Sequence, residues 1–266
     1  MPSTYLKPCF SARSKCGLQI ADSSSSSSSK HSVGFLRIER NVTRTTKATA
    51  ALGKRMMGPG RAWARFYYEE LPHLSKKIVV PPEDEDDPTD YSAAIMQQYR
   101  YMRGEFRTGI EGLKGCTSLY IISRKAVYAT HWWEDISFNP SAYWAAYDDD
   151  ELFQFTVTDM LRDGGKFHAP LDANKIVDDY IKVYHIRSNA VYRQLINMGG
   201  NELGYSEQWD QTKATVGELV PKLIGPARWR DVEYYSADNN KVHDSKTLDR
   251  GNNLFKYDKT HVIGEG

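Results

Sequence analysis

The sequence predicts an α+β domain built around a largely antiparallel β-sheet or sandwich with inserted helices, preceded by a disordered N-terminal tail. Two segments rich in β-forming residues, 117–123 and 126–133, are separated by a short turn and predict a hairpin. Segments of helical composition lie between this hairpin and further strand-like runs, as in α+β domains. Because no G-x-G-x-x-G follows a strand and no phosphate-binding loop motif occurs, a dinucleotide-binding fold is disfavoured.

The first 60 residues have the composition of an unfolded tail. They contain the serine run Ser23–Ser29, ten Lys or Arg residues and only two acids. This segment therefore carries a net charge of +8. Because the whole chain has a net charge of +1, the remaining residues carry −7. We expect a disordered, basic, Ser/Thr-rich tail over 1–60, with the composition of an organelle transit segment, and a single α+β domain over 61–266.

The predicted elements of the domain follow in chain order. An exposed acidic loop is expected at 81–90, because like charges repel and three prolines prevent regular strand pairing. Apolar residues at helical spacing predict a helix over Tyr91–Arg107. A second helix is expected over 151–162, with Asp149 or Asp150 as its cap. Further along the chain we expect a strand at 181–186, helices at 189–198 and 206–223, and a strand at 252–258.

Composition and motif spacing exclude several classes of function. Lys and Arg are interspersed with acids after residue 60, so no nucleic-acid-binding groove is expected. No apolar run is long enough to span a bilayer, and the first 30 residues lack the apolar core of a secretory signal. We therefore expect an intracellular protein, cytoplasmic or imported into an organelle such as the mitochondrion. The histidines show no metal-ligand spacing, so neither a metal nor a cofactor is expected.

A cysteine and a histidine lie in the two strands of the predicted hairpin. Cys116 precedes the first strand, and His131 lies fifteen residues later in the second. A two-residue turn at Ser123-Arg124 would place them directly opposite each other, and one at Arg124-Lys125 would make them diagonal neighbours on one face. A three-residue loop would put the two side chains on opposite faces, because strand side chains alternate. The sequence leaves these three registers open.

A thiol next to an imidazole can act as a nucleophile. Histidine lowers the thiol pKa from about 8.5 and can supply a proton to the leaving group. The backbone amides of Gly115 and Thr117 would then support a developing oxyanion. In the alternative interpretation, Cys116 is a small buried hydrophobic residue and His131 is a core residue beside two tryptophans.

The segment Gly109–Glu134, with Gly-Cys-Thr-Ser at 115–118, resembles the active-site hairpin of the cytotoxic necrotizing factor catalytic domain. It is also similar to the bacterial chemoreceptor glutamine deamidases, which share the layered fold and the Cys-then-His order. The resemblance implies hydrolysis of a glutamine side chain on a partner protein to glutamate, or transfer of its acyl group to an amine. It implies that Cys116 is the nucleophile and that His131 is the base and acid.

The chain departs from this family in one respect. In the family, a residue upstream of the cysteine orients the histidine, and no such residue can be assigned here. Glu134 and Asp135 follow His131 closely and are candidates to assist it.

The sequence thus predicts a cysteine-dependent amidohydrolase of the glutamine deamidase or transglutaminase type, whose substrate is a protein that presents a glutamine. The alternative is a non-enzymatic protein-interaction module on the same scaffold. In that case the tail or the acidic loop at 81–90 would contact the partner.

Overall fold

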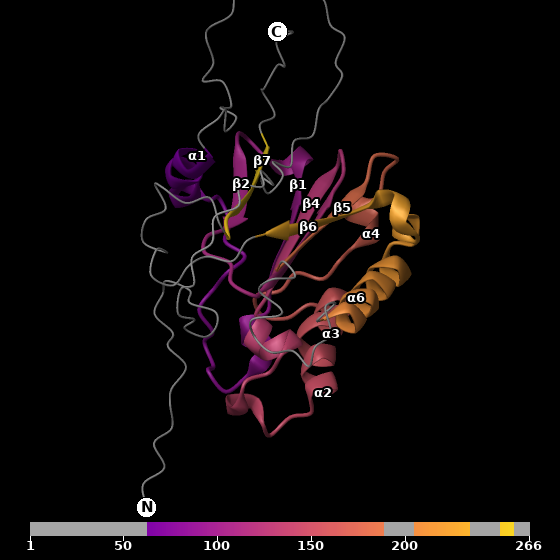
Figure 1. Cartoon of the computed structure of the whole chain (residues 1–266). Helices are drawn as coiled ribbons and strands as arrows, with labels where there is room; N and C mark the ends of the chain where they lie inside the picture. Colours follow the sequence, from indigo (N-terminus) through magenta and orange to yellow (C-terminus); the bar gives the residue numbers. More distant parts are fainter. Residues whose placement is uncertain (1–62, 189–204, 235–250, 258–266) are drawn as a thin grey trace, which may run out of the picture.

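The computed structural model describes residues 63–188, 205–234 and 251–257, which form two β-sheets flanked by helices (Figure 1). The larger sheet has the strand order β1-β4-β3-β5-β6, and the smaller one pairs β2 with β7. The strands are β1 (Ala93–Gln98), β2 (Phe106–Ile110), β3 (Thr117–Ile122), β4 (Ala126–Trp132), β5 (Lys182–Ser188), β6 (Trp229–Tyr234) and β7 (Asn253–Tyr257). All neighbouring strands are antiparallel except the parallel pair β5 and β6. The predicted α+β class with a largely antiparallel sheet is confirmed, whereas the tail predicted at 1–60 lies outside the described residues.

Helices connect and cover these strands. The α-helices are α1 (Trp63–Glu70), α2 (Asp149–Phe153), α3 (Asp159–Asp163), α4 (Ala173–Ile176) and α6 (Ser206–Leu219). The 3-10 helices are η1 (Leu71–His73), η2 (Pro88–Tyr91), η3 (Tyr99–Tyr101), η5 (Ala142–Trp144), η7 (Pro221–Leu223) and η8 (Pro226–Arg228), and the π-helical segments are η4 (Glu134–Phe138) and η6 (Gln154–Thr158). None of the helices in the described ranges is long and apolar enough to cross a membrane.

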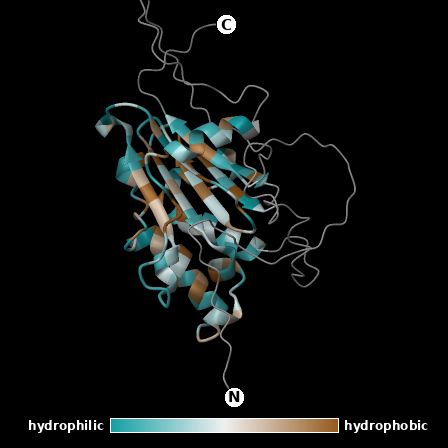
Figure 2. Ribbon diagram, turned by 90° about the vertical axis from the view of Figure 1, so that its left-hand side faces the viewer, coloured by the Kyte–Doolittle hydropathy of each residue, from teal (hydrophilic) through white to brown (hydrophobic). Residues whose placement is uncertain are grey.

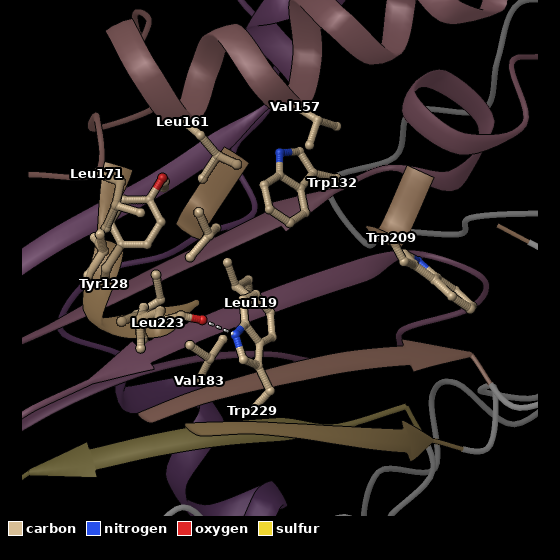
Figure 3. Packing of buried hydrophobic residues seen from close by; sticks show 14 of the residues in the cluster. Leu119, Tyr128, Trp132, Val157, Leu161, Leu171, Val183, Trp209, Leu223 and Trp229 are labelled. Atoms are coloured by element: carbon tan, nitrogen blue, oxygen red, sulfur yellow. Dashed lines mark hydrogen bonds between the residues drawn. The ribbon is translucent and has the colours of Figure 1, made fainter. Parts of the chain in front are cut away.

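One face of the five-stranded sheet packs against the helices (Figure 3). Trp132 of β4 lies beside Val157 of η6, and Leu161 of α3 belongs to the same buried cluster. Trp209 of α6 packs into this layer, and the Trp229 indole N–H donates to the Leu223 carbonyl over 2.8 Å. All of these side chains are buried, so the helices remove one sheet face from water and contribute hydrophobic stabilisation.

The other face of the sheet packs against the small β2–β7 sheet. Tyr120 of β3 joins Phe106 of β2 and Phe255 of β7 in a second buried cluster. The Tyr120 hydroxyl donates to the Asn253 side chain over 2.5 Å, which satisfies this buried polar group. Every residue of β3 and β4 is buried, because both sheet faces are covered. Apolar positions accordingly lie along the central strands, whereas the outer helices and loops are more hydrophilic (Figure 2).

The helix predicted over Tyr91–Arg107 is wrong, because this segment instead forms β1, η3 and β2. Ala94 and Met96 contact the helix-side cluster, while Ile95 between them contacts the opposite cluster. This two-residue alternation is that of a strand whose two faces contact different apolar clusters. Pairing of all six β1 residues with β4 outweighs the helix propensity of the segment.

Most other predicted elements are confirmed, with shifts at their ends. The helical stretch from Asp149 to Asp163 includes the predicted 151–162, but its cap is Asp148, not Asp149 or Asp150. The Asp148 side chain accepts from the N-terminal backbone, and Glu151 reaches back to the Asp148 N–H. The strands predicted at 117–123, 126–133, 181–186 and 252–258 and the helix predicted at 206–223 all form, whereas 189–198 lies outside the described residues.

The acidic loop at 81–90 differs in part from the prediction. Most of its acids are exposed, but Asp90 is buried and accepts hydrogen bonds from the Glu83 and Asp84 backbone N–H groups. Burial is the largest single effect on the Asp90 pKa and acts to raise it, but the two backbone hydrogen bonds and the Lys166 charge together bring the pKa below its usual value. The loop is therefore folded around one carboxylate. Strand β6 was not predicted from the sequence. It lies at the edge of the sheet, and its exposed charged residues interrupt the apolar alternation that would indicate a strand.

Candidate active site

The register of the β3–β4 hairpin decides where His131 lies relative to Cys116. Ser118 pairs with His131 and Thr117 with Trp132, so the turn residues are Arg124-Lys125. Cys116 and His131 are therefore diagonal neighbours on the same face, with Cα atoms roughly 7–8 Å apart in standard strand geometry. This is one of the two registers that bring the thiol and the imidazole to one face.

The turn itself is stabilised by a serine side chain. The Ser123 Oγ accepts from the backbone N–H groups of Lys125 and Ala126, at 3.0 and 3.1 Å. The Arg124 N–H donates to the Asp178 carboxylate at 2.7 Å. These bonds hold the turn at two residues, and hence hold the register that places Cys116 beside His131.

Cys116 lies at the entrance to β3 and is 1% exposed. Its side chain belongs to the buried cluster beneath the β2–β7 sheet, together with Trp133 and Tyr234. The Tyr234 hydroxyl donates to the Cys116 carbonyl at 2.7 Å, and the thiol lies 3.9 Å from the Lys114 carbonyl. The backbone around the thiol is therefore positioned from β6 as well as from β3.

His131 lies in β4 and is 2% exposed. The Trp133 ring makes an edge contact with the imidazole, with ring centroids 5.1 Å apart. Within the described part of the chain, the buried Nδ1 of His131 has no hydrogen-bond partner. One ring nitrogen is thus not committed to a structural hydrogen bond, which suits a group that moves protons.

Asp135 completes a cluster of three ionisable side chains. It lies in the π-helical segment η4 directly after β4 and is half-buried. The Asp135 pKa is raised to about 6, chiefly by burial and then by negative charge on Cys116, whereas positive charge on His131 acts to lower it. Asp135 is therefore close enough to both groups for their charges to act on it. In the sequence, Asp135 was a candidate only because it lies just after the predicted strand, next to Glu134.

Glu134 lies on the other side of the entrance to β3. Its carboxylate occupies the space where a side chain on Gly115 would be, and Gly115 has a φ of +83°. The Tyr205 hydroxyl donates a hydrogen bond to the buried Glu134 carboxylate. If the Gly115 backbone N–H stabilises an oxyanion, as predicted, that oxyanion has to lie away from the Glu134 carboxylate, because the two negative charges repel each other.

Thr117 points its side chain to the opposite face of the sheet. Its Oγ1 accepts from the Trp209 indole N–H at 3.3 Å, which ties β3 to α6. Any contribution of Thr117 to the candidate site is therefore limited to its backbone.

The described residues contain no group of three His, Cys, Asp or Glu side chains that could hold a metal ion. His185 Nδ1 lies 3.0 Å from Asp231 Oδ1, and His168 Nε2 lies 3.0 Å from Thr130 Oγ1, so each has a structural partner. His73 is exposed on η1, and the two remaining histidines of the predicted domain, His243 and His261, lie outside the described ranges.

No protein-family model, no curated protein and no solved structure matches this chain. The assignment of a function therefore depends on the chemistry of the Cys116 cluster and on the short resemblance around it.

Proposed function

We propose that this chain is a thiol-dependent protein-glutamine deamidase-like hydrolase, with Cys116 as the nucleophile and His131 as the base and acid. The observation that carries the proposal is the placement of Cys116 and His131 as diagonal neighbours on one sheet face. Asp135 is a third ionisable side chain at this site, because charge on Cys116 and on His131 affects its pKa, and its presence supports the proposal. This grouping places a thiol, an imidazole and a carboxylate within electrostatic reach of one another, and these are group types that thiol hydrolases use.

The reaction divides into two acyl-transfer steps. His131 takes the thiol proton, and the Cys116 thiolate attacks the glutamine carboxamide carbon to form a C–S bond. Nearby backbone N–H groups stabilise the tetrahedral oxyanion. The C–N bond then breaks, and ammonia leaves with the proton from His131. Water, deprotonated by the same imidazole, attacks the thioester, the C–S bond breaks, and glutamate and the thiol are released.

Asp135 acts in this scheme through its charge. With a pKa of about 6, it is ionised at neutral pH and stabilises the imidazolium that forms when His131 takes the thiol proton. It acts by charge, without a hydrogen bond to His131 Nδ1, so among the described residues the orienting residue of the family has no counterpart.

Access to the thiol is the main structural requirement of the proposal. Cys116 and His131 are both buried, so the proposal requires the site to open transiently in the free chain, which would admit substrate and small thiol reagents alike. Asp135 is half-buried and marks the side of the cluster that is nearest to solvent.

The experiment is intact-mass analysis of glutamine-containing proteins and peptides incubated with the full-length chain. Conversion of an amide to an acid adds about 1 Da, and this gain should disappear in Cys116→Ser and His131→Ala. The double variant Cys9→Ser/Cys16→Ser removes the other two thiols of the chain and should retain the activity. A mass gain that survives in Cys116→Ser would refute the assignment of the nucleophile.

The burial of Cys116 and His131 favours one alternative, a non-enzymatic interaction module in which both are packing residues. Iodoacetamide labelling of the Cys9→Ser/Cys16→Ser background separates the two functions. A hydrolase predicts labelling of Cys116 in native buffer well below pH 8, slowed by His131→Ala. An interaction module predicts labelling only after denaturation.

A further inference from the structure

A tryptophan lies directly across the hairpin from Cys116. The β3–β4 pairing ends with Thr117 opposite Trp132, so one residue further on Cys116 is opposite Trp133. The backbone of Trp133 is extended, with a φ of −75° and a ψ of 133°, which continues the alternation of β4. Directly opposite residues on neighbouring strands have Cβ atoms about 5 Å apart. Trp133 is therefore the direct cross-strand neighbour of Cys116, whereas His131 is the diagonal one.

The Trp133 indole is buried together with the thiol and the imidazole. Trp133 is 8% exposed and belongs to the same apolar cluster as Cys116. Its ring makes an edge contact with the His131 imidazole, and the two ring planes are inclined by 83°. A substrate group that binds between the thiol and the imidazole would therefore also lie against this indole.

The Trp133 indole carries a hydrogen-bond donor without an acceptor. Among the described residues, its buried Nε1 has no hydrogen-bond partner, and neither has Nδ1 of His131. A buried N–H group without a partner is costly, and nearly all such groups in folded proteins are satisfied. A ligand that brings an acceptor oxygen into this site would recover the free energy of the missing bond.

Position distinguishes Trp133 from its neighbour Trp132. The Trp132 Nε1 is also buried and without a partner in the described part of the chain. However, Trp132 lies on the helix side of the sheet, beside Val157 (Figure 3). An unpaired indole N–H does not by itself identify a site, but the one on Trp133 lies on the sheet face that carries the thiol and the imidazole.

The same alternation directs the Glu134 carboxylate away from Trp133. Glu134 accepts from the Tyr205 hydroxyl, and Tyr205 belongs to the cluster on the helix side. Trp133 belongs to the cluster on the other face. A donor on the Trp133 side can therefore stabilise an oxyanion without the repulsion that Glu134 would exert next to Gly115.

We propose that the Trp133 indole N–H donates to the carbonyl oxygen of the substrate amide and to the oxyanion that forms from it. This inference rests on the proposed function, because it assigns a further catalytic residue to the same reaction. When the Cys116 thiolate attacks the amide carbon, the C–S bond forms and the π electrons of the C=O bond move to oxygen. An N–H donor that is already in place in a buried site stabilises this charge without rearrangement of solvent.

The test compares two reagents on the full-length Cys9→Ser/Cys16→Ser chain, in which Cys116 is the only thiol. p-Nitrophenyl acetate acetylates a thiolate through a tetrahedral oxyanion and expels p-nitrophenolate, whereas iodoacetamide alkylates it by displacing iodide, without an oxyanion. Both reagents have to reach the same buried thiol, so the ratio of their rate constants corrects for access. Intact mass identifies the modification of Cys116.

Trp133→Phe and Trp133→Leu should each lower the ratio of acetylation to alkylation about a hundredfold, because each removes the donor to the oxyanion. Both replacements keep an apolar side chain and leave no former partner of the N–H unsatisfied, so both should fold. Circular dichroism checks the fold. Trp132→Phe is the matched control, since it removes the same N–H from the opposite face of the sheet and should leave the ratio unchanged.

The outcomes separate this inference from the proposed function. An unchanged ratio in both Trp133 variants would overturn the inference and leave the proposed function standing, because the parent chain would still be acetylated at Cys116. An equal fall of the ratio in Trp132→Phe would also overturn it, since the lost donor would then not be the cause. If neither reagent modifies Cys116 in the native parent chain, the proposed function fails and the inference fails with it.

Discussion

The carboxylate of Glu134 fills the space where a side chain on Gly115 would lie, directly before the candidate nucleophile. Gly115 also has a φ of +83°, which residues with a Cβ atom rarely adopt. Two independent constraints therefore select glycine at this position, one from the backbone and one from packing.

Gly115→Ala should lower the free energy of unfolding by about 2–4 kcal/mol, because left-handed backbone strain and overpacking add. Urea unfolding monitored by circular dichroism measures this change. Gly104→Ala is the matched control, since a Cβ atom there would meet no atom within 4 Å, and it should shift the free energy by less than about 0.5 kcal/mol. Similar losses in the two variants would show that Glu134 does not restrict residue 115.

Asp135→Asn should stabilise the fold at pH 8 while slowing the chemistry at Cys116. The Asp135 pKa is raised by burial to about 6, above its unfolded value, so its contribution to stability is present at low pH and is lost as the pH rises from about 4 to 6. Replacing the carboxylate by an amide should gain about 1–2 kcal/mol at pH 8, a value reduced for partial exposure. Thermal unfolding and iodoacetamide labelling of the same variant measure the two effects.

Asp210→Asn provides the control for Asp135→Asn, because Asp210 is exposed on α6 and should change neither quantity. Loss of stability in Asp135→Asn at pH 8 would contradict the raised pKa. Unchanged labelling of Cys116 would exclude an electrostatic role for this carboxylate.

His168 should make the fold sensitive to acid. Burial lowers the His168 pKa to about 3, so the folded protein keeps the ring neutral while the unfolded chain binds a proton below about pH 6.5. Stability is therefore lost as the pH falls from about 6.5 towards 3, by about 2 kcal/mol at pH 5. His168→Gln should flatten this part of the stability curve, whereas His73→Gln, at an exposed site, should leave it unchanged. Equal slopes for His168→Gln and the parent chain would contradict the assignment.

Lys256→Met should be strongly destabilising. The Lys256 ammonium lies 2.9 Å from Glu70 Oε1 in a buried ion pair that links β7 to α1, and Arg107 lies 3.0 Å from the other Glu70 oxygen. Removing the lysine leaves a buried carboxylate with one fewer partner, at a cost of about 2–4 kcal/mol in unfolding free energy. Denaturant unfolding measures this loss.

Two variants test the origin of the Lys256→Met effect. The double variant Glu70→Gln/Lys256→Met should recover part of the lost stability, because the uncompensated charge is removed as well. Lys175→Met breaks an exposed pair with Asp172 and should cost less than about 1 kcal/mol. A loss in the double variant as large as the sum of its parts would argue against a coupled pair.

Local sequence patterns were sufficient for much of the sheet and for the residues of the candidate site. The segments that became β3 and β4 are rich in β-forming residues and are separated by a short turn, which predicted the hairpin without reference to any other part of the chain. The helical stretch through α2 and α3 was predicted from its acidic start and its apolar spacing. Cys116 and His131 were predicted as site residues from their chemistry, their separation and the family resemblance of the segment around them.

Contacts between distant parts of the chain decided the rest. The segment Tyr91–Arg107 has apolar residues that fit a helix, but its part Ala93–Gln98 pairs with β4 and becomes a strand, because that pairing satisfies its backbone hydrogen bonds. The hairpin register was open until the Ser123 and Asp178 contacts fixed a two-residue turn. The electrostatic effect of Cys116 and His131 on Asp135 arises only when the folded chain brings β3, β4 and η4 together. Periodicity and propensity act over a few neighbouring residues, whereas the register, the burial and the local charge of a site depend on side chains far apart in the sequence.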